Sequence, residues 1–181
     1  MPNWCSNDVT IYGMKEQPAK DLVAAAKESK LLNWIAPMPK ELEDTKAPSD
    51  DGVNWYNWRV NKWGTKWDVH CHFVEYEKEE GGTYKIELSF DSAWSPPIQA
   101  FEVLQENYPE IDVDHYYFEP GCDFCGCNGD DYSPYEIYKQ TKDGIKPNQE
   151  VQELIDRFGL MEGYYDDEDE IDGIRLEMKE V

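Results

Sequence analysis

Positive charge is scarce in this chain. Lysine and arginine number 17 against 39 aspartates and glutamates, which gives a formal net charge of −22 over 181 residues. Such a charge repels the phosphates of nucleic acid and the surface of anionic membranes. We therefore expect no direct binding to nucleic acid or membrane, and an affinity for basic proteins.

Long apolar runs are also missing. No stretch approaches the roughly 20 apolar residues of a membrane-spanning helix. The opening residues, M-P-N-W-C-S-N, have neither the basic start nor the apolar stretch of a signal peptide. The five cysteines are an odd number, so a complete set of disulfides is not expected. These features predict a cytoplasmic protein with reduced thiols.

Tryptophan, by contrast, is abundant and clustered. Five of the seven tryptophans lie between Trp55 and Trp94. A length of 181 residues suits one domain with an appendage, and a hydrophobic fraction of 40% is enough for a buried core. We expect a folded domain with a specific aromatic assembly near the middle of the chain.

The hydrophobic pattern predicts an α+β fold. Apolar and polar residues alternate with the period of a strand in four segments, 5–12, 67–76, 84–90 and 111–118. Apolar residues recur at helical spacing in two segments, 19–30 and 98–108. The order β-α-β-β-α-β is typical of a ferredoxin-like sandwich, an antiparallel four-stranded sheet with two helices on one face.

Local patterns give finer expectations. In the second strand, Cys71 and Phe73 are predicted to share one face, and His70 and His72 the opposite face. A histidine pair can bind metal or a proton, but an exposed sheet surface is the plainer interpretation. Ser95 is predicted to cap the second helix, with a proline at the first helical position.

The remaining segments set the predicted domain limits. The ferredoxin-like domain covers residues 1–128 and contains a Trp-rich insertion at 32–66. Residues 129–181 form an acidic C-terminal extension, with a helix at about 147–158 and an edge strand at 173–179.

A set of ordered, Trp-rich motifs resembles the YubB-like family over roughly residues 2–128. These motifs are P-N-W-C-S-N at 2–7, P-M-P at 37–39, N-W-R-V at 57–60, W-G-T-K-W-D at 63–68, A-W-S-P-P at 93–97 and F-E-P-G-C-D-F at 118–124. The resemblance implies a ferredoxin-like core and an origin in a phage, plasmid or other mobile element, hence the cytoplasm of a host cell. It implies no reaction. Cys125, Cys127 and the tail beyond residue 146 depart from the family pattern.

The two central Trp motifs are the first candidate site. An indole supplies a stacking face and a lysine a cation, so the motifs can line a pocket for a ligand, a peptide or single-stranded nucleic acid. The net charge argues against nucleic acid. The structural alternative is that the tryptophans pin the 32–66 insertion onto the sheet. The predicted ligand or partner surface consists of Trp63, Lys66, Trp67, Asp68, Trp94 and Glu119, the last as a proton-transfer group.

A cysteine-rich segment at 120–133, predicted to be a loop, is the second candidate. Cys122, Cys125 and Cys127 are close enough to share a zinc ion. The fourth ligand could then be Cys5, His70, His72 or His115. The chain lacks the second cysteine pair of most zinc sites, so free cysteines are the simpler interpretation, and redox chemistry is weaker still. No cofactor is predicted, with zinc as the open alternative.

An acidic run near the C-terminus is the third candidate. It consists of Asp166, Asp167, Glu168, Asp169 and Glu170. Such a run is usually a solvated loop. The alternative is a surface that mimics the phosphates of nucleic acid and competes for a basic nucleic-acid-binding protein.

Together these features favour a non-enzymatic function. We expect an acidic accessory protein of a phage or mobile element that binds a host or phage protein, through its tryptophans or as a nucleic-acid mimic. The alternative is a small-molecule-binding domain or small enzyme with its pocket at the two Trp motifs. None of the common catalytic motifs accompanies that pocket.

Overall fold

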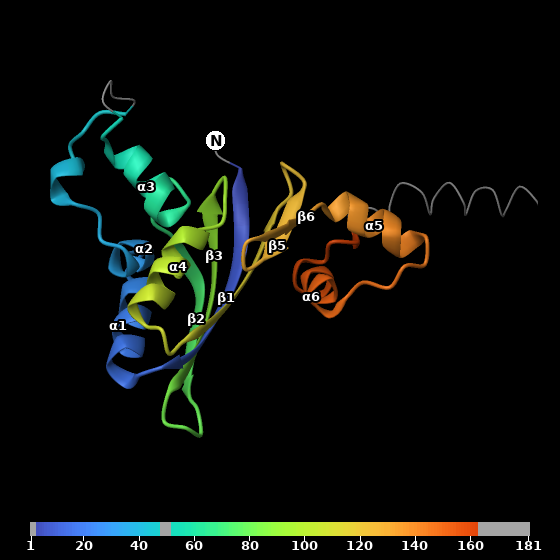
Figure 1. The fold of residues 1–181 in the computed structure, drawn as a ribbon, viewed down its shortest axis with the longest axis horizontal. Helices are drawn as coiled ribbons and strands as arrows, with labels where there is room; N and C mark the ends of the chain where they lie inside the picture. Colours follow the sequence, from blue (N-terminus) through green and yellow to red (C-terminus); the bar gives the residue numbers. More distant parts are fainter. Residues whose placement is uncertain (1–2, 48–51, 163–181) are drawn as a thin grey trace, which may run out of the picture.

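A six-stranded antiparallel sheet forms the centre of the computed structural model, which describes residues 3–47 and 52–162. The strand order is β2-β3-β1-β4-β5-β6 (Figure 1). The strands are β1 (Trp4–Met14), β2 (His70–Lys78), β3 (Tyr84–Ala93), β4 (Asp112–Glu119), β5 (Phe124–Cys127) and β6 (Asp130–Tyr132).

The first four strands and two of the helices confirm the predicted ferredoxin-like core. Helix α1 (Glu16–Lys27) follows β1, and helix α4 (Ile98–Asn107) follows β3. The prediction of only four strands was wrong. β5 pairs with β4 and β6 with β5, so the segment predicted as a loop at 120–133 contains a hairpin that widens the sheet.

The other helices lie on both sides of the sheet. They are α2 (Leu31–Ile35), α3 (Trp55–Trp63), α5 (Pro134–Lys142) and α6 (Gln149–Phe158), with a short 3₁₀ turn at Lys40–Leu42. In Figure 1, α1 to α4 lie on one side of the sheet, and α5 and α6 lie on the other, beyond the β5–β6 hairpin. The insertion between α1 and β2 therefore contains two helices and the 3₁₀ turn, and α6 matches the helix predicted at 147–158.

The main hydrophobic core lies between the sheet and α1, α2 and α4. Alternate residues of β1 and β3, including Val9, Ile11 and Leu88, face these helices and are fully or almost fully buried. The opposite face of the four core strands is largely polar. A second, smaller core forms on that opposite face, where Leu154 and Phe158 of α6 pack near Phe118 and Cys125.

A bulge in β2 corrects the predicted position of Phe73. The register with β3 shifts between Cys71 and Phe73, so His72 is an extra residue opposite Phe90. Cys71 is therefore buried in the core, but Phe73 turns to the polar face and is 40% exposed. A one-residue insertion reverses every later side chain of a strand, which is why simple alternation gave the wrong face.

The start of α4 also differs from its prediction. The helix begins at Ile98, and Pro97 is the capping residue. Ser95 does not cap it, because its hydroxyl donates to the carbonyl oxygen of Gly64 at 2.6 Å. The predicted edge strand at 173–179 and the acidic run at 166–170 lie outside the described residues.

Candidate functional site

The two central Trp motifs are joined directly to each other. Gly64 ends α3 in a left-handed conformation, with φ of 88°. The next residue, Thr65, donates its hydroxyl to the carbonyl oxygen of Ala93 at 2.8 Å, and Ser95 donates back to Gly64. The W-G-T and A-W-S segments therefore form a hydrogen-bonded clamp between the insertion and the end of β3.

Replacing Gly64 by alanine is expected to weaken this clamp. A Cβ at Gly64 would lie 3.0 Å from the carbonyl oxygen of Pro96 and would collide with the side chain of Gln99. Gly82 is a matched control, because it has a similar φ of 87° and no atom lies within 4 Å of the position that a Cβ would take there. We expect Gly82→Ala to cost about 1 kcal/mol of unfolding free energy and Gly64→Ala about 2–3 kcal/mol. Urea denaturation measures both, and equal costs would show that the contact with α4 is not tight.

Trp63 is a structural residue of the core. Its side chain is 1% exposed, and its indole N–H donates to the carbonyl oxygen of Ala36 at 2.8 Å. The guanidinium of Arg59 lies 4.9 Å from the Trp63 ring and 5.3 Å from the Trp55 ring. This packing fixes α3 against the segment that follows α2.

Asp68 is also committed to the fold. Its carboxylate accepts the backbone N–H groups of Leu32 and Asn33, at the start of α2, and that of Val69, all at 2.9–3.0 Å. Burial raises the pKa of Asp68, and the three backbone hydrogen bonds oppose that rise. The carboxylate thus satisfies N–H groups that a short helix leaves unpaired.

Glu119 lies at the end of β4 and holds the turn into β5. Its carboxylate is 1% exposed and accepts the backbone N–H groups of Gly121 at 2.9 Å and Cys122 at 2.6 Å. A buried carboxylate with these partners is poorly placed to exchange a proton with a ligand. The structure gives Glu119 a local structural role.

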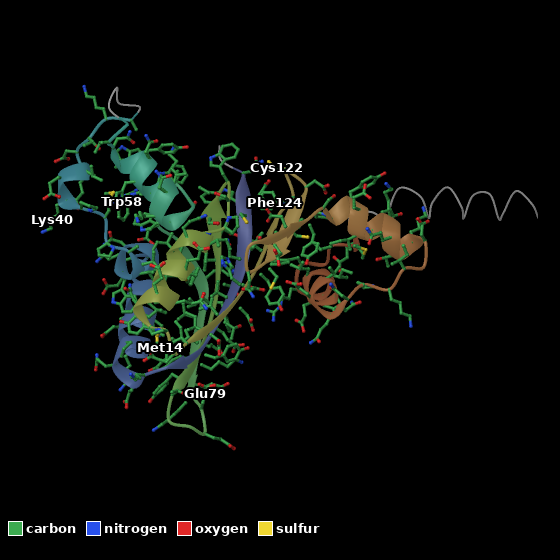
Figure 2. The ribbon with its side chains drawn as sticks, in the orientation of Figure 1. Met14, Lys40, Trp58, Glu79, Cys122 and Phe124 are labelled. Atoms are coloured by element: carbon green, nitrogen blue, oxygen red, sulfur yellow. The ribbon has the colours of Figure 1, made fainter. Side chains whose placement is uncertain are left out.

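All five cysteines are free. Cys122 is exposed at the turn before β5 and accepts a hydrogen bond from Asn3, just before β1, at 3.6 Å (Figure 2). Cys125 and Cys127 are buried in β5, and burial is the main reason that the pKa of each rises to about 12. Within residues 3–47 and 52–162, no three His, Cys, Asp or Glu side chains are placed to share a metal ion. Zinc binding stays a prediction.

An open groove lies on the polar face of the sheet. Its volume is about 600 Å³. The rings of Trp4 and Trp67 lie side by side at one end, with centroids 6.3 Å apart and planes tilted by 40°. We call this site the Trp4–Trp67 groove, and it is lined by Trp4, Ser6, Trp67, Asp68, His70, His72, Asp91 and Ala93.

Strand register builds the floor of the Trp4–Trp67 groove. Ser6 of β1 and His70 of β2 both pair with Asp91 of β3, so the three side chains form a row across the sheet. The hydroxyl of Ser6 donates to the carboxylate of Asp91 at 3.1 Å. The hydroxyl of Ser29, after α1, lies 2.9 Å from Nδ1 of His70. Three separate segments therefore fix the polar groups of the groove.

The six residues predicted as a ligand surface do not share one pocket. Only Trp67 and Asp68 line the groove. Lys66 lies beside it, with its ammonium 4.6 Å from the Trp67 ring centroid, and Trp94 is 50% exposed but not part of the lining. Trp4, Ser6 and Asp91 also line the groove but were not among the predicted ligand residues. Trp4 and Ser6 belong to the P-N-W-C-S-N motif and Asp91 follows the predicted strand at 84–90, but the sequence does not give the register that brings the three together.

The match to one family model agrees with the ferredoxin-like fold of the core. Residues 62–139, from the end of α3 into α5, match the model of a family described as "Ferredoxin-like domain in Api92-like protein". Among solved structures, the chain is similar to protein api92 from Yersinia pseudotuberculosis, at 10% sequence identity and a TM-score of 0.39, over 74% of this chain and 98% of the other. No curated protein matches. None of the described helices is long and apolar enough to cross a membrane.

Proposed function

We propose that this chain is a non-enzymatic acidic accessory protein of a phage or other mobile element, and that it binds a host or phage protein through the Trp4–Trp67 groove. The mobile-element origin rests on the resemblance of the Trp-rich motifs to the YubB-like family. The binding role rests on the groove itself.

The observation that carries the binding role is a pair of exposed tryptophans. Trp4 is 51% exposed and Trp67 is 37% exposed, and their rings are in contact range of each other. Tryptophan is enriched among the residues that contribute most to protein interfaces, because one rigid ring buries a large area at little entropic cost. Two such rings next to polar groups form a suitable anchor for a partner.

The state of the acidic groups supports a binding role over catalysis. Asp68 and Glu119, the two carboxylates of the predicted ligand surface, are held by backbone N–H groups. Both carboxylates therefore already accept hydrogen bonds that hold the backbone of the folded protein. The net charge of −22 favours a basic partner through long-range attraction. Nucleic-acid mimicry by residues 166–170, which lie outside the described residues, remains part of this proposal.

One observation favours the alternative of a small-molecule-binding domain or small enzyme. The Trp4–Trp67 groove, at about 600 Å³, is within the size range of small-ligand sites. It also presents His70, His72 and Asp91, which are polar groups able to orient a ligand or exchange a proton. A ligand that binds the groove and excludes the protein partner would support this alternative.

A capture experiment with three baits tests the proposal. The baits are the wild-type protein, the double variant Trp4→Ala/Trp67→Ala, and a variant with residues 166–170 neutralised, each exposed to host lysate at low and moderate salt. A protein captured by wild type is then purified and titrated against all three baits. We expect the double variant to weaken binding by at least about 30-fold, from the loss of two interface tryptophans.

The control is Tyr135→Ala, which removes another exposed aromatic ring, on α5 and outside the groove. We expect it to change the affinity by less than about twofold. If only the variant with residues 166–170 neutralised loses binding, the acidic run and not the groove is the binding site. Equal binding by the double variant and by wild type would contradict the proposed site.

A further inference from the structure

We infer that the Trp4–Trp67 groove recognises an arginine side chain of the partner protein. This inference rests on the proposed function, because it names the chemistry that the same groove selects. An exposed carboxylate lies beside the two indole rings of the groove. Asp91 lines the groove and is exposed, and its one side-chain hydrogen bond in the described part of the chain comes from Ser6.

The charge balance around Asp91 leaves it available to a cation. Two acidic side chains of the polar face already have basic partners, since Glu87 pairs with Lys85 at 3.0 Å and Asp8 lies 3.9 Å from Arg157. Among the described residues, no lysine or arginine lies within 4 Å of Asp91, and none lines the groove. Asp68 adds a second negative charge to the lining. Backbone N–H groups already hold Asp68, and the Lys66 ammonium lies over the Trp67 ring beside the groove. An incoming cation therefore finds its free carboxylate at Asp91.

The indole rings favour a flat cation. The chain itself places cations over indoles: Lys66 lies over Trp67 of the groove, and Arg59 lies over both Trp55 and Trp63 outside it. No cation of the described residues lies over the Trp4 ring. A guanidinium stacks on an aromatic face and donates two parallel hydrogen bonds to a carboxylate, whereas an ammonium is a strongly hydrated point charge. The combination of an indole face with Asp91 thus selects arginine over lysine.

Other ligands of aromatic grooves would use the site differently. An aliphatic peptide or a sugar would pack on the two indoles and would depend little on the charge of Asp91. The dependence on this single charge therefore separates arginine recognition from both.

The test uses the whole protein and a short blocked peptide, acetyl-Gly-Arg-Gly-amide, at 0.15 M salt. Matched peptides carry lysine or citrulline in place of arginine, and citrulline keeps the shape but has no charge. Binding is followed by NMR through the indole N–H signals of the seven tryptophans. We expect the arginine peptide to shift the signals of Trp4 and Trp67 and to leave that of the buried Trp63 unchanged. Lysine is expected to bind about threefold more weakly and citrulline at least about tenfold more weakly.

Two charge-removing variants complete the test. Asp91→Asn keeps an oxygen that can accept the hydrogen bond from Ser6. It is expected to lower the affinity for the arginine peptide by about tenfold. Glu75→Gln removes the same charge from β2, at a position on the same sheet face but outside the groove lining, and is expected to have less than a twofold effect. Both variants are checked by thermal unfolding, so that a loss of fold is recognised.

Three results would overturn the inference. These are equal binding of the arginine and citrulline peptides, equal losses for Asp91→Asn and Glu75→Gln, and no change of the Trp4 and Trp67 signals at any peptide concentration. Each of them leaves the proposed function to be judged by its own experiment. A captured partner that needs Trp4 and Trp67 but not Asp91 would keep the groove as the binding site and remove arginine as its ligand.

Discussion

Replacing Trp63 by alanine is expected to lower the free energy of unfolding by about 3–5 kcal/mol. The side chain is 1% exposed, contacts the ring of Trp58 edge-on at 5.8 Å and carries the guanidinium of Arg59 over its own ring. Alanine would leave a large cavity between α3 and the core, and the carbonyl oxygen of Ala36 would lose its indole donor. Urea denaturation with an unchanged m-value measures the loss.

Two further variants separate the contributions of Trp63. Trp63→Phe retains most of the ring volume but removes the N–H donor, so a loss of about 1–2 kcal/mol is expected. Trp94→Ala is the control, because it removes the same side chain from a half-exposed position and should cost less than about 1 kcal/mol. If Trp63→Ala cost no more than Trp94→Ala, the tryptophans would not be what holds the insertion to the core.

Acid is expected to destabilise the protein through one buried histidine, His115. Its Nε2 lies 2.9 Å from Oδ1 of Asn7. The amide nitrogen of Asn7 donates to the carbonyl oxygen of Cys5 at 2.7 Å and to the hydroxyl of Ser92 at 2.9 Å, so Oδ1 is the acceptor and Nε2 carries the hydrogen. The other ring nitrogen, Nδ1, is buried without a hydrogen-bond partner. The side chain is therefore a neutral imidazole.

The direction of the pH effect follows from this burial. Burial lowers the pKa of His115 from 6.5 to about 3, so the unfolded chain takes up a proton at a higher pH than the native one does. The contribution of His115 to stability is complete above pH 6.5 and is lost as the pH falls toward 3. The limiting slope is about 1.4 kcal/mol per pH unit.

Comparison with a non-titrating variant isolates the histidine from the many carboxylates. In His115→Gln an amide can still donate to Asn7. The free-energy difference between wild type and this variant should shrink steadily from pH 6.5 downward. NMR gives an independent readout, because the ring C–H signals of His115 should not titrate above about pH 4. Titration near pH 6.5 would contradict the buried neutral imidazole.

The sequence predicted the fold where the strands were long and regular. β1 and β3 alternate over most of their length, and the helices that follow them show clear apolar stripes. β5 and β6 are only four and three residues long and contain glycine and aspartate, so their alternation is too short to detect. The bulge at His72 reversed the face of Phe73, because no residue type marks a bulge of this kind.

The site was harder to predict than the fold, for a different reason. The residue types that bind a ligand, such as tryptophan and aspartate, also stabilise loops. Trp63 and Asp68 belong to the same motif as Trp67, yet Trp63 is buried in the core and Asp68 holds the start of α2. Trp4 joins Trp67 only through the pairing of β1 with β3, which brings residues 4 and 93 together. Such non-local pairing is set by the tertiary structure.

The central claim is that the Trp4–Trp67 groove binds the partner protein, and the affinity of the purified partner for Trp67→Ala tests it most directly. Isothermal titration should give a dissociation constant at least about tenfold higher than that of wild type, whereas Tyr135→Ala should stay within about twofold. An unchanged affinity for a folded Trp67→Ala protein would contradict the claim.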